Sequence, residues 1–382
     1  MTPARSAAFR ILLAVERGGY ASDLLDAAGL EPRDAGLASE IVFGVLRRRA
    51  QLDFLIEHYS GRKAKLDPPV RAALRMGVYQ MRYLDRVPSH AAVSQSVELV
   101  KRAKKTSAAG FVNAVLRKVD REPVRWPDRA TELSHPAWLL ERWDAQYGRE
   151  TADAIARANL RQPETYIRVP RGSPPPRGAK QEGPPGCYRV PAGETGGFRI
   201  QDIGSQSIPP LLKLKHGQTL LDLCAAPGGK TKQALESGVR AIACDVHPRR
   251  IAMLRGAGAD LVVLDGTRPL PFGRRFERIL LDAPCSGTGT LARNPEIKWK
   301  LKPEDLPKLQ KVQRSLLTQA RAALAPGGLM VYSTCSLEHE ENEDVIASLD
   351  PAEVRRILRR IPGRDAGDGF FAAVIESGIA RK

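Results

Sequence analysis

Residues 219–231 read TLLDLCAAPGGKT, an apolar run that ends in an acid and passes into a turn of small residues. Short apolar runs bounded by glycine and proline are typical of buried strands. The residues after the turn, up to about 237, predict a helix. A strand, a tight turn and a helix in succession indicate an α/β fold.

The same alternation continues from about residue 201 to the end of the chain. Strands are predicted at 219–223, 241–245, 261–264, 278–282, 329–333 and 370–375. Helices are predicted at 229–237, 248–257, 304–325 and 339–349. Apolar strands separated by helices indicate a mainly parallel sheet covered on both faces, and such sheets bind ligands at the carboxyl ends of their strands.

The turn at 222–231 invites comparison with two known nucleotide-binding motifs. A phosphate-binding P-loop needs a glycine where Cys224 stands, and the glycine pattern of dinucleotide folds is absent. What remains is a turn with exposed backbone N–H groups, which suits a carboxylate. Downstream, Asp245 can accept from ribose hydroxyls and Asp265 from an adenine amino group. Each acid alone is equally well explained as a strand-end turn former, but the series favours a nucleoside site.

The run Asp282-Ala283-Pro284-Cys285 follows another predicted strand. Attack on C6 of a cytosine requires a proton or a strong hydrogen bond at its N3, and an aspartate whose pKa is raised by burial can supply it. The alternative for Cys285 is a buried thiol that packs as a small hydrophobic residue. The turn residues that follow, Ser286 to Gly289, argue against that alternative.

A second thiol lies in Thr334-Cys335-Ser336, between a predicted strand and a polar segment that opens a helix. A helix dipole can lower the pKa of a thiol there and make it a nucleophile. Glu338, Glu340 and Glu341 would oppose that lowering. The residues alone leave open which of the two thiols attacks, and Cys224 and Cys244 are interpreted as structural.

The first 126 residues predict helices throughout, with apolar residues at helical spacing and basic runs at 47–49 and 101–105. Residues 127–200 are mixed, with a helical stretch at 138–158 and a strand at 164–169. After Val169, residues 171–186 are too rich in proline and glycine for regular structure and predict a loop or linker. We therefore expect three parts, at 1–126, 127–200 and 201–382.

The composition narrows the class of protein further. A formal charge of +17 favours a polyanion as partner, and an aromatic content of 5% argues for recognition of phosphates and RNA shape rather than extensive base stacking. Five unevenly spaced cysteines and six histidines form neither a disulfide framework nor a metal-binding pattern, so no metal is expected. We find no leader and no membrane-spanning run, and expect a cytoplasmic protein.

Several of these stretches together resemble a known family, the RNA cytosine-C5 methyltransferases that use S-adenosyl-L-methionine. The matching runs are 222–231, 282–287, 293–296 and 333–336, flanked by 201–206 and 367–371. The runs 44–47, 77–80 and 111–117 resemble the NusB-like RNA-binding domain. This pairing is similar to the bacterial 16S rRNA methyltransferases of the RsmB (Sun/Fmu) type. It implies an all-α NusB-like domain followed by a Rossmann-like methyltransferase domain.

The resemblance also implies roles for individual residues. Cys335 is the implied nucleophile, Cys285 assists release of the methylated RNA, and Asp282 lies where cofactor and cytosine meet. The residues implied for the cofactor are Cys224, Ala225, Ala226, Pro227, Gly228, Gly229, Lys230, Asp245, Asp265 and Asp282. Lys230 is left with two possible partners, the target RNA or Asp282.

The expected partner is 16S ribosomal RNA, and we expect no membrane association and a monomer. Two other functions remain open from the sequence. One is the same chemistry on transfer RNA or large-subunit RNA, against which the helical domain argues. The other is a non-catalytic RNA-binding factor, against which the intact Asp282, Cys285 and Cys335 argue.

Overall fold

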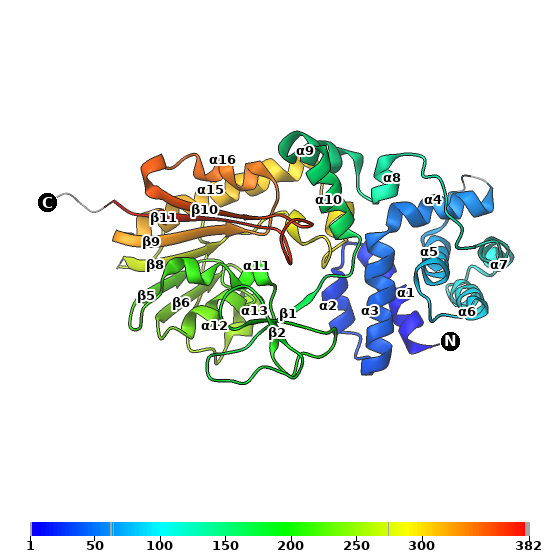
Figure 1. Cartoon of the computed structure of the whole chain (residues 1–382), viewed down its shortest axis with the longest axis horizontal. Coiled ribbons are helices and arrows are strands. Elements are labelled where there is room, and N and C mark those ends of the chain that lie inside the picture. Colours follow the sequence, from blue (N-terminus) through cyan, green and yellow to red (C-terminus); the bar gives the residue numbers. More distant parts are fainter. Residues whose placement is uncertain (1, 62, 64, 274, 379–382) are drawn as a thin grey trace. The chain divides into compact units, whose positions relative to one another are not determined.

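The computed structural model describes residues 2–61, 63, 65–273 and 275–378 (Figure 1). By their internal contacts, the described residues form two compact units. Unit 1 holds residues 1–162 together with 291–300, and unit 2 holds 163–290 together with 301–382. In the described residues, no helix has the length and apolar character needed to cross a membrane.

Unit 1 is helical, as the sequence predicts for its first 126 residues. Its longer helices are α1 (Pro3–Glu16), α3 (Pro32–Arg47), α4 (Arg49–Ser60), α5 (Pro68–Tyr83), α6 (Ser89–Arg102), α7 (Ala109–Arg117), α9 (Ala137–Tyr147) and α10 (Arg149–Asn159). Two short helices, α2 (Ala21–Asp26) and α8 (Arg129–Leu133), connect them. Proline occupies the first turn of α1, α3 and α5, where its missing N–H costs no hydrogen bond.

Two glycines let these helices approach one another closely. A Cβ atom added at Gly44 of α3 would overlap the Tyr79 ring of α5, and one at Gly77 of α5 would meet the Leu116 side chain of α7. Both glycines are in helix interiors, where glycine is unfavourable on its own. Close packing of α3, α5 and α7 around one apolar core is the reason that glycine is needed at both positions.

The segment 291–300, which the sequence places with the C-terminal part, packs in unit 1. Its short helix α14 (Ile297–Lys300) is held by the end of α3. Lys298 Nζ donates to the Arg47 carbonyl at 2.9 Å, and Trp299 Nε1 donates to the Leu46 carbonyl at 2.7 Å. In return, Arg47 Nε donates to the Ala292 carbonyl at 2.8 Å. The carbonyls at the end of a helix have no partner within that helix, so these bonds satisfy groups that would otherwise need water.

Unit 2 is built on a sheet that has seven strands in the described residues, in the order β10-β11-β9-β8-β5-β6-β7. The strands are β5 (Thr219–Asp222), β6 (Arg240–Asp245), β7 (Asp260–Val263), β8 (Phe276–Asp282), β9 (Leu324–Thr334), β10 (Val354–Arg360) and β11 (Phe370–Glu376). The five strands from β9 to β7 run parallel, and β11 is antiparallel to both of its neighbours. The predicted mainly parallel α/β fold is confirmed.

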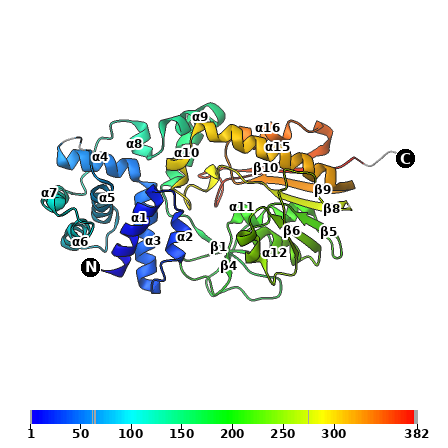
Figure 2. The same cartoon turned by 180° about the vertical axis from the view of Figure 1, so that it is seen from behind.

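Both faces of this sheet are covered by packed side chains. Adjacent residues of a strand point to opposite faces, so each strand contributes to two cores. Leu221 and Leu281 pack in the core beneath α15 (Leu306–Ala323) and α16 (Glu343–Ile346). Leu220 and Leu280 pack in a second core, which includes α12 (Gly229–Leu235). Figures 1 and 2 show these two helical layers on opposite faces. Each fully buried leucine contributes about 1.5–3 kcal/mol, so both cores hold the strand ends in place.

Two regions differ from the sequence prediction. Strand β10 was not predicted, because its VRRILRR sequence reads as a charged surface, yet it pairs along β11 at the edge of the sheet. Arginines on an exposed edge strand discourage pairing with another chain, which explains their presence in a strand.

The stretch 170–200 contains strands that join the predicted β1 (Thr165–Arg168), and one of them lies within residues 171–186, for which the sequence predicts no regular structure. The added strands are β2 (Lys180–Gln181), β3 (Cys187–Val190) and β4 (Arg199–Ile200), and the described residues give a small sheet of order β2-β3-β1-β4. These strands are only two to four residues long, which is why the proline- and glycine-rich turns between them dominate the sequence pattern. Short helices α11 (Ile203–Gln206) and α13 (Pro248–Ile251) complete unit 2.

The tight crossing at Gly44 gives a test of the helical packing. We expect Gly44→Ala to destabilise unit 1 by about 1–3 kcal/mol, because the added methyl group must displace the Tyr79 ring. Gly36→Ala is the matched control in the same helix, since nothing lies within 4 Å of its added Cβ. That control should stabilise the unit by about 0.5–1 kcal/mol. Urea unfolding measures both changes, and equal effects would contradict the packing described here.

Candidate active site

The candidate residues lie where the parallel strands of unit 2 end. Asp282 of β8 pairs in register with Ser333 of β9, and Asp222 of β5 pairs with Leu280 of β8. Asp245 ends β6, and Asp265 follows β7 by two residues. The order of the strands reverses between β5 and β8, and a reversal of this kind is where parallel sheets bind ligands. The structure therefore brings the predicted residues to one edge of one sheet.

The two thiols meet directly. Cys285 Sγ lies 3.4 Å from Cys335 Sγ, within hydrogen-bond distance for sulfur, and both side chains are half-buried. Two backbone bonds hold the turns that carry them. Ala283 N donates to the Ser333 carbonyl at 2.8 Å, and Gly289 N donates to the Cys335 carbonyl at 2.9 Å. Two turns that are 50 residues apart in the chain thus form one thiol pair.

The surroundings of Cys285 keep it protonated. The hydrogen bond with Cys335, then burial, and then the charge of Glu341 raise the pKa of Cys285 well above the ordinary value of a thiol. A neutral Cys285 can donate its proton to the sulfur of Cys335. Burial also raises the pKa of Cys244 to about 12 and that of Cys224 well above its ordinary value, so neither is an activated nucleophile.

Asp282 has a different environment from the one that the sequence suggested. Its side chain keeps 30% of its exposure, so the burial expected there is absent. Lys230 Nζ donates to Asp282 Oδ2 at 2.6 Å, and Ser333 Oγ donates to Oδ1 at 2.8 Å. Burial opposes the charge of Lys230, but the charge of Asp282 outweighs it and raises the pKa of Lys230. The sequence left two partners open for Lys230, the target RNA and Asp282, and in this structure Lys230 pairs with Asp282.

Sequence reasoning missed the residue that joins the two thiol turns, Glu341. Its side chain is buried, and Oε1 accepts from Ser286 N at 2.8 Å and from Gln313 Nε2 at 2.9 Å. Oε2 accepts from the hydroxyls of Ser286 and Ser336, which follow Cys285 and Cys335 directly in the chain. One carboxylate therefore fixes both turns. In the sequence alone, Glu341 reads only as a negative charge near Cys335, although the serine after each cysteine is a usable signal.

The turn at 224–230 is shaped by small side chains. Gly228 has a φ of +97°, and a Cβ there would meet the Leu254 side chain at 2.6 Å. Ala225 and Ala226 are buried, and Ala225 N donates to the Cys244 carbonyl at 2.8 Å. Glycine and alanine carry no atoms beyond Cβ that could themselves cover the backbone of the turn. The turn thus fits a ligand that approaches the backbone closely.

Three acids accompany this turn, and each has a local partner. Asp222 is 1% exposed and accepts from Thr231 Oγ1 at 2.7 Å, and burial raises its pKa to about 7. Asp245 Oδ1 accepts from His247 N at 2.9 Å. Asp265 is 43% exposed, and hydrogen bonds from Thr267 lower its pKa. Asp222 therefore holds the end of the turn through its hydrogen bond with Thr231. Asp245 and Asp265 remain predicted ligands of a nucleoside.

Comparison with known proteins identifies the family. A model described as 16S rRNA methyltransferase RsmB/F matches residues 209–359, the NusB family matches 2–121, and a ferredoxin-like domain of RsmF/B-like methyltransferases matches 135–173. Probable ribosomal RNA small subunit methyltransferase B of Bacillus subtilis is 31% identical, over 90% of this chain and 87% of the relative. The chain belongs to this methyltransferase family.

Another relative and two solved structures are also similar to this chain. Ribosomal RNA small subunit methyltransferase B of Cronobacter sakazakii is 33% identical, over 94% of this chain and 95% of the relative. The crystal structure of PH0851 shares the fold along the whole chain, with a TM-score of 0.79, 23% identity and 99% coverage of both chains. A methyltransferase homologue from Pyrococcus horikoshii covers 66% of this chain, at 26% identity and a TM-score of 0.56.

Family membership establishes the class of enzyme. The protein is an rRNA methyltransferase with an N-terminal NusB domain, and its methyl donor is S-adenosylmethionine. The small-residue turn at 224–230 and the acids that follow β6 and β7 fit such a group, since they offer close backbone approach and hydrogen-bond acceptors at successive strand ends.

The Glu341 carboxylate gives a first test of this site. We expect Glu341→Gln to lower kcat by roughly 10- to 100-fold, because small displacements of reacting groups are costly. The substitution should also lower the pKa of Cys285, since it removes the Glu341 charge that helps to raise it. The pH dependence of iodoacetamide labelling at Cys285, resolved by mass spectrometry, measures that change.

Glu343→Gln is the matched control for Glu341→Gln. It removes the same charge from the same segment, but Glu343 pairs with Arg359 at 2.6 Å and bonds neither serine. The control should leave both kcat and the labelling of Cys285 near wild type. An unchanged labelling profile in Glu341→Gln would show that its carboxylate does not act on the thiols.

Buried Asp222 gives a second test, through the pH dependence of stability. Its folded-state pKa of about 7 lies above the ordinary 3.8, so the carboxyl stabilises the fold most at low pH and this stability is lost as pH rises toward 7. Asp222→Asn should therefore gain on the wild type with rising pH, by up to about 4 kcal/mol in total. Urea unfolding between about pH 4 and pH 8 measures the difference, and a constant offset would contradict the prediction.

Proposed function

We propose that this enzyme methylates C5 of a cytosine in 16S ribosomal RNA through a transient bond between Cys335 and C6 of the base. It would do so in the cytoplasm, where the small ribosomal subunit is made. The observation that carries the proposal is the thiol pair: Cys285 Sγ and Cys335 Sγ are 3.4 Å apart at the carboxyl edge of the sheet, and Asp282 ends the strand that precedes Cys285.

Addition to a pyrimidine requires a nucleophile and a proton donor on the same base. In the proposed first step, the Cys335 thiolate forms a bond to C6 while N3 receives a proton, so no negative charge accumulates on the ring. Lys230 and Asp282 supply that proton together. Their hydrogen bond is 2.6 Å long, and a proton that moves from Nζ to Oδ2 would let Asp282 present an O–H to N3.

The remaining steps restore the base and the enzyme. S-adenosylmethionine supplies the methyl group to C5. The C5 proton then passes to a water molecule as its electron pair re-forms the C5–C6 double bond and expels the Cys335 thiolate, and the N3 proton returns to the Lys230–Asp282 pair. Cys285, 3.4 Å from the departing sulfur, assists this release, and Glu341 keeps its turn in place throughout. To reach the thiols, the target base must leave its stack.

The two thiols predict opposite outcomes when each is removed. We expect Cys335→Ala to abolish methylation, because no bond to C6 can form. Cys285→Ala should instead accumulate a covalent RNA–protein complex, because release is impaired. Bisulfite sequencing of 16S rRNA maps the methylated cytosine, and a denaturing gel with labelled RNA detects the complex.

Cys244→Ala serves as the control for these thiol variants, because Cys244 is fully buried in strand β6, which pairs with β5 and β7 rather than with β8 or β9. It should retain methylation and form no stable complex. A complex trapped by Cys335→Ala rather than by Cys285→Ala would reverse the roles of the two cysteines. Methylation found only in transfer RNA or large-subunit RNA would overturn the proposed substrate.

A further inference from the structure

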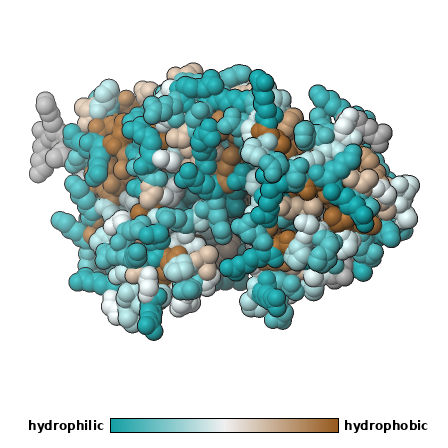
Figure 3. Space-filling view, turned by 45° about the vertical axis from the view of Figure 1, so that its right-hand side comes forward, coloured by the Kyte–Doolittle hydropathy of each residue, from teal (hydrophilic) through white to brown (hydrophobic). Residues whose placement is uncertain are grey.

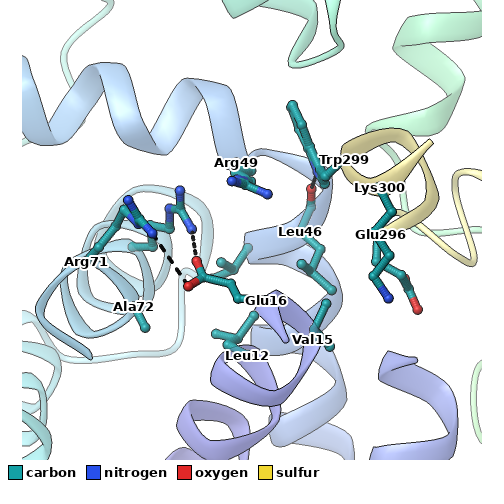
Figure 4. Close-up of a pocket in the computed structure, with 12 residues that line it drawn as sticks. Leu12, Val15, Glu16, Leu46, Arg49, Arg71, Ala72, Glu296, Trp299 and Lys300 are labelled. Carbon is teal, nitrogen blue, oxygen red and sulfur yellow. Dashed lines mark hydrogen bonds and ion pairs between the residues drawn. The ribbon is translucent and has the colours of Figure 1, made fainter. Parts of the chain in front are cut away.

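Unit 1 contains a cavity of about 270 Å³, separate from the thiol site of unit 2. Helices α1, α3, α4, α5 and α14 line it. Figure 4 shows Arg71 and Ala72 on one side, Glu296, Trp299 and Lys300 on the other, and Leu12, Val15 and Leu46 between them. This size is just below the roughly 300–1,000 Å³ of ligand pockets, so it suits a group as small as a nucleobase.

Several charged groups at the cavity are already paired. Arg75 bonds Asp53 at 2.6 Å and Glu16 at 2.8 Å, so the Glu16 carboxylate is engaged within the protein. Lys300 Nζ donates to the carbonyls of Gly18 and Gly19, at 3.1 and 2.6 Å. These groups shape the cavity, but they have little capacity left for a ligand.

Glu296 is different. Its side chain is 1% exposed, and Oε1 accepts from Ala21 N, at the start of α2, at 2.8 Å. Oε2 is buried and has no hydrogen-bond partner among the residues that the structure describes. A buried carboxylate oxygen without a donor costs free energy, and native proteins seldom leave one. An N–H group from a ligand in the cavity would satisfy it.

Arg49 needs the opposite kind of partner. Its guanidinium lies 5.3 Å from the centre of the Trp299 ring, and within the described residues it forms no ion pair. Burial and then the charge of Arg75 lower its pKa, which means that its own charge is poorly compensated. Arg71 Nε is also buried without an acceptor in the described part of the chain. The cavity therefore offers donors to an anion as well as an acceptor to an N–H group.

A nucleotide carries three kinds of group that complement the carboxylate, the apolar side chains and the guanidinium in the cavity lining. A base has an N–H on its pairing edge for Glu296 and flat apolar faces for Leu12, Val15 and Leu46, and its phosphate suits Arg49. A free inorganic anion would fit Arg49 but not the carboxylate of Glu296. We propose that this cavity binds one unpaired nucleotide of the substrate RNA, other than the target cytosine. The inference rests on the proposed function in so far as RNA is the substrate.

The test uses the full-length protein and a labelled 16S rRNA fragment that contains the methylated site. Glu296→Gln keeps an oxygen for Ala21 N but replaces the free acceptor by an NH₂ donor. We expect the affinity for RNA to fall about tenfold, since a hydrogen bond to a charged group is lost. KM should rise in parallel, and kcat at saturating RNA should stay unchanged. Arg49→Gln, at a half-buried position, should act in the same direction.

Glu98→Gln is the matched control, because the Glu98 side chain in the same unit keeps 42% of its exposure and, within the described residues, its ion pair is with Arg102 four residues away. It should bind RNA as well as or better than the wild type. If Glu296→Gln and Arg49→Gln both bind RNA like the control, the cavity is no RNA site. If either lowers kcat with KM unchanged, its effect is on catalysis and the proposal is wrong.

An abasic scan of the same RNA identifies the nucleotide. At one non-target position, removal of the base should weaken wild-type binding about tenfold and should have no further effect in Glu296→Gln. Additive losses at every position would overturn the proposal. These binding measurements do not depend on the chemistry: a wild type that binds RNA but forms no 5-methylcytosine would refute the proposed function and leave the cavity to be judged by the scan.

Discussion

The parallel pairing of β8 with β9 is the constraint on which the site depends. Asp282 and Ser333 are partners in register, so the turns that follow must emerge side by side from the same edge. The Ala283 N–H and the Gly289 N–H then tie the first turn to the second strand and its turn. With the backbones fixed in this way, the two sulfur atoms come within 3.4 Å of one another.

That constraint explains how much the sequence could predict. Apolar runs alternating with helices indicate parallel strands, and parallel strands bring their carboxyl ends to one edge. The residues after each run, Asp222, Asp282 and the two cysteines, were therefore predictable as neighbours. Other elements could not be predicted from the sequence pattern. The arginines of β10 are typical of an exposed surface rather than of a strand, and the turns within 170–200 dominate a pattern whose strands are only two to four residues long.

Contacts between residues far apart in the chain were beyond the sequence pattern. The docking of 291–300 on the end of α3 depends on carbonyl groups, which every residue carries and no composition reveals. The partnership of Lys230 with Asp282 joins a turn after β5 to the end of β8. Glu341 is similar, because its role depends on two serines that are 55 and 5 residues away. Such pairs become visible only when the topology is known.

The charges around the thiols bear on how the proposed chemistry divides between them. Two thiolates 3.4 Å apart would repel strongly in a partly buried site, so the pair does not lose both protons together. Glu341 bonds the N–H of Ser286, next to Cys285, and its charge adds to the cost of ionising that thiol. Of the two thiols, Cys285 therefore has a surrounding that disfavours its ionisation. The carboxylate that positions both turns thus also makes the two thiols unequal, as the proposed division of roles requires.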